Sequence, residues 1–310
     1  MLDGILLGFG AAVFQSTSYV GSRVFEHRYP GQTVYLLSLS HIVMGIFAAA
    51  LLPFVWPDTM PAFAAYAPSL IACSSFYFIG QGLLFATLKK SSASRVSPLL
   101  GIKVFILALI GILFLGQRFG LLQWTAIMMS VAAAWMLSRT GEKLSLRGAL
   151  WIFLTCVAYC FSDINIKILV HHFDYLGLTH GVLLSVCLSY IVCGVAGVVI
   201  LTMRTKPWPR SLRSLLAMPP TAKMVVYSLP FAAAWFAAMP FLFACFGSIG
   251  VVYGNIVQSS RGIISIIFGA ALVKCNFEYL DQKVSRGVFF QRLAAAVLMS
   301  CAIALYYLGA

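Results

Sequence analysis

Residues 179–203 read THGVLLSVCLSYIVCGVAGVVILTM, a stretch without Lys, Arg, Asp or Glu. A helix needs about 20 predominantly apolar residues to cross the hydrocarbon core of a membrane, so this stretch predicts a membrane-spanning helix. Similar apolar windows, separated by charged or proline-rich breaks, recur along the whole chain. The predicted spans are residues 4–24, 32–54, 62–87, 92–115, 119–138, 147–170, 179–203, 222–246, 249–273 and 288–308.

The composition agrees with an integral membrane protein. Hydrophobic residues make up 61% of the 310 residues and charged residues only 9%, whereas about a quarter of the residues in a soluble domain are charged. The mean hydropathy is +0.96. Ten spans with short loops occupy nearly the whole chain, which excludes a soluble enzyme, a single-anchor receptor and, despite the net charge of +13, a nucleic-acid-binding protein. We therefore expect an all-α membrane protein with ten transmembrane helices.

The second half of the chain can be laid on the first. Residues 12–28 overlay residues 156–172, and residues 85–103 overlay residues 243–261. Identities are sparse, but the overlay matches charged position with charged position, so it indicates an internal repeat.

Each half contains five predicted spans, an odd number, so the second half must cross the membrane in the opposite sense to the first. We therefore predict two inverted five-helix repeats, residues 1–140 and 141–310. This architecture is associated with alternating-access transport and with a site at the repeat interface near the membrane midplane.

One stretch of the first half is similar to a known family. Residues 86–100 (ATLKKSSASRVSPLL), followed by Leu115-Gly-Gln-Arg and a Gly/Ala-rich last helix, resemble the EamA-type repeat of the drug/metabolite transporter superfamily. The resemblance implies ten helices in two inverted halves and the export or exchange of small metabolites. Relatives include amino-acid exporters, nucleotide-sugar carriers and sugar-phosphate exchangers. Gln117 replaces the acid of the family's Leu-Gly-Glu motif, and Val104 stands where a proline is frequent, which leaves the substrate open.

The basic residues predict an orientation. Of the 21 Lys and Arg residues, four lie within or just inside spans (Arg23, Lys103, Lys167 and Arg261) and one, Arg118, lies in an even-numbered loop. The other 16 surround the odd-numbered loops. By the positive-inside rule we expect those loops in the cytoplasm and both termini outside, although members of the family usually have the opposite orientation.

Lys103 and Arg261 are the sharpest functional candidates. Both lie near the middle of predicted spans, the overlay matches them with each other, and neither has an acid within one helical turn. A charge in the bilayer centre costs at least ~2.5 to 3.5 kcal/mol on insertion scales. Two unpaired cations facing one cavity suit an anionic substrate, and the resemblance implies the same, since sugar-phosphate exchangers bind phosphate with basic residues in these two helices. Alternatively, each cation pairs with a carbonyl, a helix end or Asp163 and holds the bundle together.

Other polar residues extend these candidates. Tyr253, Asn255 and Gln258 precede Arg261 on one predicted span, where they suit either a ligand or contacts between helices. Asp163 is the sole acid well within a span. Lys167 lies four residues later, so either a local ion pair or a role in proton coupling or gating fits these two residues.

Aromatic residues within the spans are candidates for the cavity wall. The overlay matches Tyr77 with Trp235, and Tyr19 lies on the first span. These rings suit a pocket for a ring or sugar, or ordinary packing. The further polar residues in the middle of spans are Gln15, His41 and Gln81.

These patterns predict a secondary transporter that moves a small phosphorylated or carboxylated organic anion by alternating access. An exporter of amphipathic or aromatic metabolites is the alternative, and an intramembrane lipid-phosphate enzyme is less favoured, because no acid pair, activated nucleophile or metal cluster is apparent. We expect no catalytic residue, metal or cofactor. The expected partners are a small-molecule substrate and membrane lipid, not nucleic acid, and a homodimer is compatible with the sequence. The expected location is the bacterial inner (plasma) membrane.

Overall fold

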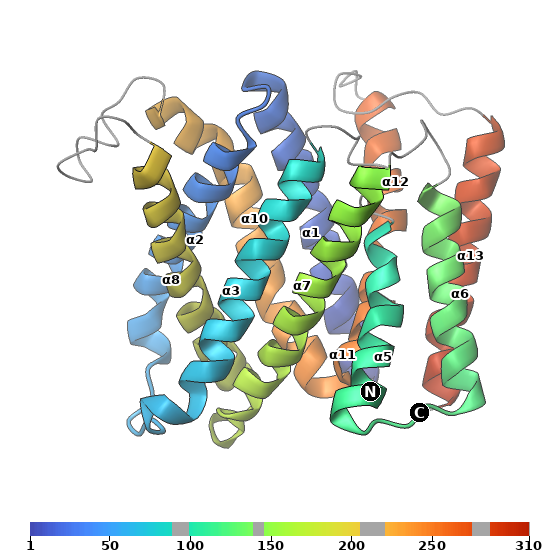
Figure 1. Cartoon of the computed structure of the whole chain (residues 1–310), viewed down its shortest axis with the longest axis horizontal. Helices are drawn as coiled ribbons and strands as arrows, with labels where there is room; N and C mark the ends of the chain where they lie inside the picture. Colours follow the sequence, from blue (N-terminus) through green and yellow to red (C-terminus); the bar gives the residue numbers. More distant parts are fainter. Residues whose placement is uncertain (89–98, 139–145, 205–220, 275–285, 310) are drawn as a thin grey trace.

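The computed structural model describes residues 1–88, 99–138, 146–204, 221–274 and 286–309 of the chain. These residues form helices joined by short turns and contain no β-strand. The helices run side by side, and both termini lie at the same end of the bundle (Figure 1). The described part of residues 1–140 contains α1 (Leu2–Arg28), α2 (Thr33–Val55), α3 (Phe63–Leu88), η1 (Leu100–Ile102), α5 (Lys103–Leu115) and α6 (Leu121–Ser138).

The remaining part of the chain follows a similar order. It contains α7 (Leu146–His171), the short η2 (Asp174–Leu176), α8 (Leu178–Arg204), α10 (Thr221–Ile249), α11 (Val251–Gln258), α12 (Arg261–Lys274) and α13 (Arg286–Leu308). The predicted span at residues 249–273 is two helices, α11 and α12, because a turn at residues 259–260 separates them. Gly250, at φ +80°, separates α11 from the preceding helix α10. Part of the predicted span at residues 92–115 lies outside the described residues.

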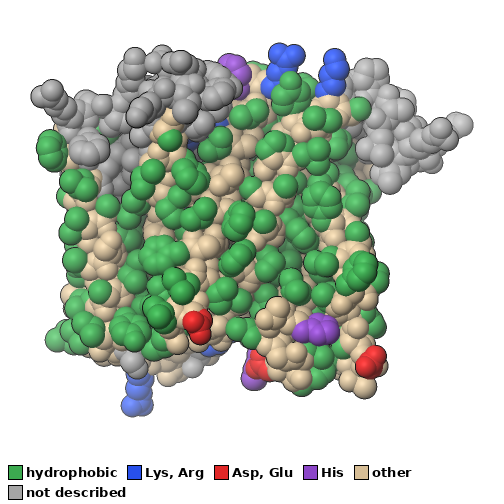
Figure 2. Space-filling view, turned by 180° about the vertical axis from the view of Figure 1, so that it is seen from behind, with side chains coloured by type: hydrophobic (Ala, Val, Ile, Leu, Met, Phe, Trp, Pro, Cys, Tyr) green, Lys and Arg blue, Asp and Glu red, His purple; other side chains and the backbone are tan. Residues whose placement is uncertain are grey.

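Within the described residues, five helices are long and apolar enough to cross a membrane. They are Thr33–Val55, Phe63–Thr87, Gly148–His171, Leu178–Met203 and Ala222–Ile249. Shorter apolar helices occupy Leu100–Phe114, Leu121–Met136 and Leu293–Leu308. Large hydrophobic side chains cover the middle of the molecular surface, while charged side chains gather at its two ends (Figure 2). This distribution is that of an integral membrane protein.

The bundle is built from helix pairs that join distant parts of the sequence. The closest packing partners are α1 with α10, α3 with α7, α2 with α8, and α6 with α13. Glycines permit two of these approaches. A Cβ on Gly21 of α1 would lie 2.7 Å from the backbone nitrogen of Phe231, and one on Gly45 of α2 would lie 2.9 Å from the Cα of Gly194. Backbones approach this closely only where side chains are absent.

The Leu-Gly-Gln-Arg segment ends α5. Gly116 adopts the left-handed conformation (φ +62°), and the backbone N–H of Gln117 donates to the carbonyl of Gly111 at 2.9 Å. The carbonyl of Gly111 is thus satisfied by the chain just after α5, and the left-handed conformation explains why a glycine stands at position 116.

Candidate functional site

A cavity lies inside the bundle, enclosed by α1, α3, α5, α7, α8, α10, α11 and α12. It contains about 520 Å³ of empty space, its open side included. One side of the cavity is polar and carries the groups contributed by α1, α5, α11 and α12, together with Asp163 of α7. The rest of the wall is mostly apolar and aromatic, and comes from α3, α7, α8 and α10.

On the polar side, Lys103 forms an ion pair with Asp163. The Nζ atom of Lys103, the first residue of α5, donates to Oδ2 of Asp163 on α7 at 2.7 Å, and both side chains are about 95% buried. Asn255 of α11 donates its Nδ2 to the same carboxylate oxygen at 2.8 Å. The two donors on one carboxylate oxygen tie three helices together, and these hydrogen bonds offset part of the cost of burying the charges.

Arg261 has different partners. Its Nη1 atom donates to Oε1 of Gln15 on α1 at 3.1 Å, and Gln258 donates to the same oxygen at 3.0 Å. Arg261 is 8% exposed. Among the described residues, no Asp or Glu lies within salt-bridge distance of its guanidinium, so a buried cation faces the cavity with only a neutral amide as partner.

Aromatic rings form part of the opposite wall. Tyr77 stacks on Trp235 at a centroid distance of 6.2 Å and meets the edge of Tyr190 at 5.9 Å. Tyr159 stacks on Tyr77 from the other side at 6.4 Å, and its ring lies 5.5 Å from the ammonium of Lys103. The aromatic wall therefore borders directly on the charged groups.

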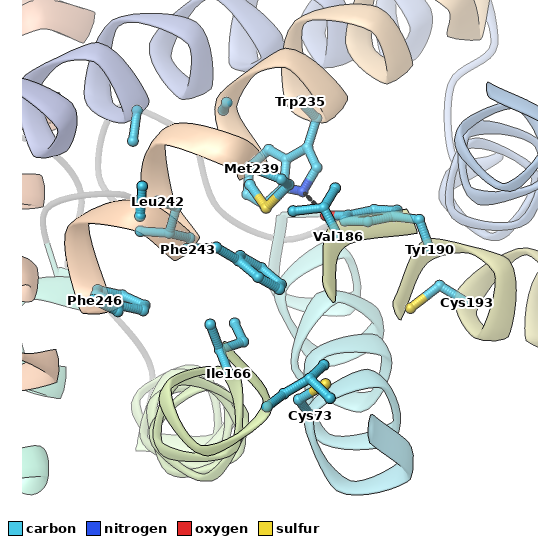
Figure 3. Packing of buried hydrophobic residues seen from close by; sticks show 14 of the residues in the cluster. Cys73, Ile166, Val186, Tyr190, Cys193, Trp235, Met239, Leu242, Phe243 and Phe246 are labelled. Atoms are coloured by element: carbon cyan, nitrogen blue, oxygen red, sulfur yellow. Dashed lines mark hydrogen bonds between the residues drawn. The ribbon is translucent and has the colours of Figure 1, made fainter. Parts of the chain in front are cut away.

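Aliphatic and sulfur-containing side chains complete the wall. Ile166, Met239, Phe243 and Cys73 converge on this region from α7, α10 and α3 (Figure 3). A ligand that fills the cavity thus meets charge on one side and apolar surface on the others, a combination typical of small-molecule sites.

The structure gathers most of the residues proposed from the sequence. Six of them line the cavity, namely Lys103, Arg261, Gln258, Tyr77, Trp235 and Asp163. Asn255 and Tyr19 lie directly behind this set, Asn255 on the Asp163 carboxylate and Tyr19 against the Trp235 ring at 6.2 Å.

Two proposed residues lie away from the cavity. Tyr253 stacks on Tyr306 at 4.7 Å and donates its hydroxyl to the carbonyl of Ile303, so it packs α11 against α13. Lys167 is exposed at the end of α7 near Gly250.

The expected pairings of the charges need correction. The spacing of Asp163 and Lys167 favours a local ion pair, but Asp163 pairs with Lys103 of another helix. Lys103 is therefore not an unpaired cation, and the expectation of two free cations holds for Arg261 alone. Sequence spacing within a helix cannot reveal this, because the partner comes from a segment 60 residues away.

Sequence reasoning missed Tyr159 and Tyr190 as wall residues and did not assign Gln15 to Arg261. The overlay of residues 12–28 on residues 156–172 contained a signal, because it matches Gln15 with Tyr159. Both side chains contact the cation that lies beside them in the cavity.

Comparison with known proteins agrees with this architecture. Residues 2–139 match the EamA-like transporter family, which is part of the drug/metabolite transporter superfamily, so the resemblance read from the sequence is confirmed. Members of this family are membrane transporters rather than enzymes. The match lies in the first half of the chain.

A solved structure, titled only "Crystal structure of protein", shares the fold. It aligns over 99% of each chain with a TM-score of 0.64 and 14% sequence identity. At this identity the likeness concerns the fold and not the substrate. No curated protein matches the chain.

Proposed function

We propose that this chain is a secondary transporter that moves a small organic anion by alternating access. The match of residues 2–139 to the EamA-like transporter family supports the transporter class. The observation that carries the proposal is Arg261, a buried cation at the cavity whose guanidinium donates to a neutral side-chain amide, that of Gln15. An ion in this environment is costly unless an anion reaches it, and guanidinium binds carboxylate or phosphate with two parallel hydrogen bonds.

The helix pairing supports an inverted repeat. In the sequence overlay α1 corresponds to α7, and α10 corresponds to α3. The α1–α10 contact and the α7–α3 contact are then counterparts, and each joins one helix from either half. The cavity lies between the two halves, which is where rocking of one half against the other would open it alternately to the two sides.

The positions of Lys103 and Arg261 in the fold support a substrate site at discontinuous helices. Lys103 is the first residue of α5, directly after a 3₁₀ turn, and Arg261 is the first residue of α12, directly after the break from α11. Transporters of inverted-repeat architecture commonly bind substrate at such interrupted helices.

The overlay also accounts for the difference between the two cations. The position that corresponds to Asp163 in the first half is Tyr19, which contributes no charge. The cavity consequently contains Lys103, Arg261 and one carboxylate, a net charge of +1 from these groups. This balance favours a monoanion at Arg261.

Asp163 is suited to couple substrate transport to proton movement. Its carboxylate already neutralises Lys103, so a substrate anion that approaches Lys103 competes with it, and protonation of Asp163 would release the ammonium for the substrate. We propose the Lys103–Asp163 pair as the gating element, whereas Lys167, which lies outside the cavity, is not needed for this role.

The location of the charges supports the orientation with both termini outside the cytoplasm. Arg118 lies between α5 and α6 at the end of the bundle that also contains the termini, while Arg23 and Arg28 lie toward the other end of α1. We propose the bacterial inner membrane as the location, with the Arg28 end in the cytoplasm.

The alternative is an exporter of neutral aromatic or amphipathic metabolites, in which Arg261 is structural. The observation that favours it is the largely apolar wall formed by α3, α7, α8 and α10. The two functions differ in whether the ligand needs a negative charge and whether Arg261 is required.

Thermal unfolding of the purified protein in detergent, with a panel of carboxylated, phosphorylated, neutral and cationic metabolites, distinguishes them. A ligand at a hundred times its Kd stabilises the native state by about 2.7 kcal/mol. We expect anions to stabilise the wild-type protein and the control Arg118→Gln, whose substituted side chain is exposed, but not Arg261→Gln. Equal stabilisation of Arg261→Gln by neutral ligands would overturn the anion carrier.

A further inference from the structure

The hydroxyl of Tyr77 is held behind the cavity wall by His41. The Nδ1 atom of His41 lies 2.6 Å from the carbonyl oxygen of Leu37, a distance that requires Nδ1 to carry the proton. His41 is fully buried, and its ring nitrogens contact the carbonyl of Leu37 and the hydroxyls of Ser40 and Tyr77 rather than a carboxylate, so the imidazole is neutral and Nε2 is an acceptor. The Tyr77 hydroxyl therefore donates to Nε2 at 3.1 Å, away from the cavity.

Two more aromatic side chains have their polar hydrogens occupied in the same way. The indole N–H of Trp235 donates to the hydroxyl oxygen of Tyr190 at 2.9 Å. Tyr159 donates its hydroxyl to Oε1 of the buried Gln81. These hydrogen bonds occupy the polar hydrogens of Tyr77, Trp235 and Tyr159 within the protein.

The serine hydroxyls of the wall are also occupied by the protein. Ser162 donates to the carbonyl of Cys73 at 2.9 Å, and Ser74 donates to the carbonyl of Ser189 at 3.3 Å. The donor hydrogens of these two serines are therefore used within the bundle, and only their oxygens remain, as acceptors, for a ligand.

Donors that remain for a ligand are concentrated at the charged side of the cavity. Arg261 has five N–H groups and donates one of them to Gln15, and Lys103 has three and donates one to Asp163. The recognition groups are thus segregated, with the charged donors for an anionic head at one side and, elsewhere, a wall in which Tyr77, Tyr159 and Trp235 have their polar hydrogens occupied.

We propose that the site selects monoanions with an apolar body, such as aryl or alicyclic carboxylates, and rejects polyhydroxylated anions such as sugar phosphates. This inference rests on the proposed function and specifies its substrate class. The physical reason is that a ligand hydroxyl against this largely apolar wall loses its water and finds few polar partners to replace it. Each unmatched hydroxyl should lower the affinity by about 10-fold to 100-fold.

The test uses two carboxylates with the same carbocycle, cyclohexanecarboxylate and its polyhydroxylated counterpart quinate, with phenylacetate and glucose 6-phosphate as further probes. Affinities are measured calorimetrically for the full chain in detergent, and nonspecific partition into micelles is subtracted with Arg261→Gln. We expect cyclohexanecarboxylate and phenylacetate to bind at least 100-fold more tightly than quinate and glucose 6-phosphate. Quinate binding as tight as cyclohexanecarboxylate would overturn the proposal.

A pair of variants tests the cause of the selectivity. His41→Leu removes the acceptor of the Tyr77 hydroxyl, and Gln81→Leu independently removes the acceptor of the Tyr159 hydroxyl. Neither His41 nor Gln81 lines the cavity. Each released hydroxyl can turn toward the ligand, so the preference over quinate should fall at least tenfold in whichever variant folds. An unchanged preference in a folded variant would refute the role of the locked hydroxyls.

The outcomes also separate this inference from the proposed function. If anions bind in an Arg261-dependent way but hydroxylation has no effect, the anion carrier stands and the selectivity proposal fails. If no anion binds, or binding does not depend on Arg261, the proposed function itself fails.

Discussion

Asp163→Asn gives the most direct test of the electrostatics in the bundle. The carboxylate of Asp163 lies 2.7 Å from the Lys103 ammonium, and the two side chains are 7% and 6% exposed. Removing one partner of a buried ion pair leaves an uncompensated charge and typically costs 3 to 5 kcal/mol. We therefore expect the free energy of unfolding to fall by about 3 to 5 kcal/mol.

A matched control exists on the surface. Asp174 contacts His171 with side chains 58% and 81% exposed, so solvent screens their interaction. Exposed pairs contribute about 0 to 1 kcal/mol, and Asp174→Asn should accordingly leave the unfolding free energy within about 1 kcal/mol of the wild-type value.

Unfolding by denaturing detergent in mixed micelles measures both variants, and a double variant completes a thermodynamic cycle. Lys103→Met combined with Asp163→Asn removes both charges, so it should regain most of the stability lost in Asp163→Asn alone. A saturating anionic ligand should also restore part of the loss, because the freed ammonium of Lys103 becomes a second binding group. Equal stabilities of Asp163→Asn and Asp174→Asn would refute the reasoning, since the pair would then not be buried from solvent.

Three further predictions concern packing, helix termination and orientation. Gly45→Ala places a methyl group against the Gly194 backbone and should destabilise the protein by about 1 to 3 kcal/mol. The control Gly287→Ala, which has no atom within 4 Å of the new Cβ, should be neutral or slightly stabilising. Thermal unfolding compares the two variants. Gly116→Ala forces a side chain into the left-handed conformation at the end of α5 and should cost about 1 to 2 kcal/mol in the same assay, a loss whose absence would contradict the turn geometry. A reporter that is active only in the cytoplasm should be inactive when fused after Ala310, and an active fusion would reverse the proposed orientation.

The charged residues show what the sequence reveals and what depends on contacts between helices. Lys103 and Arg261 stand out in the sequence because each interrupts an apolar window, and both do line one cavity. Their roles differ only through contacts from other helices, since Asp163 reaches Lys103 while Gln15 reaches Arg261. No periodicity within a single span contains that information.

The aromatic wall shows the same division. The overlay of the two halves correctly drew attention to Tyr77 and Trp235, which stack on each other. The direction of their polar hydrogens depends on His41 and Tyr190, which come from α2 and α8, and thus on how these helices pack.

The sequence by itself determined that the chain is an α-helical membrane protein, because hydrophobic transfer depends on composition and on the length of apolar windows. Short motifs in the first half also gave the resemblance to the EamA-type repeat, and residues 2–139 match the EamA-like transporter family. The tertiary structure decided which charges are neutralised, which donors remain free and which residues share the cavity. Those properties depend on distances of about 3 Å between atoms far apart along the chain, and such distances are set by helix packing rather than by sequence spacing.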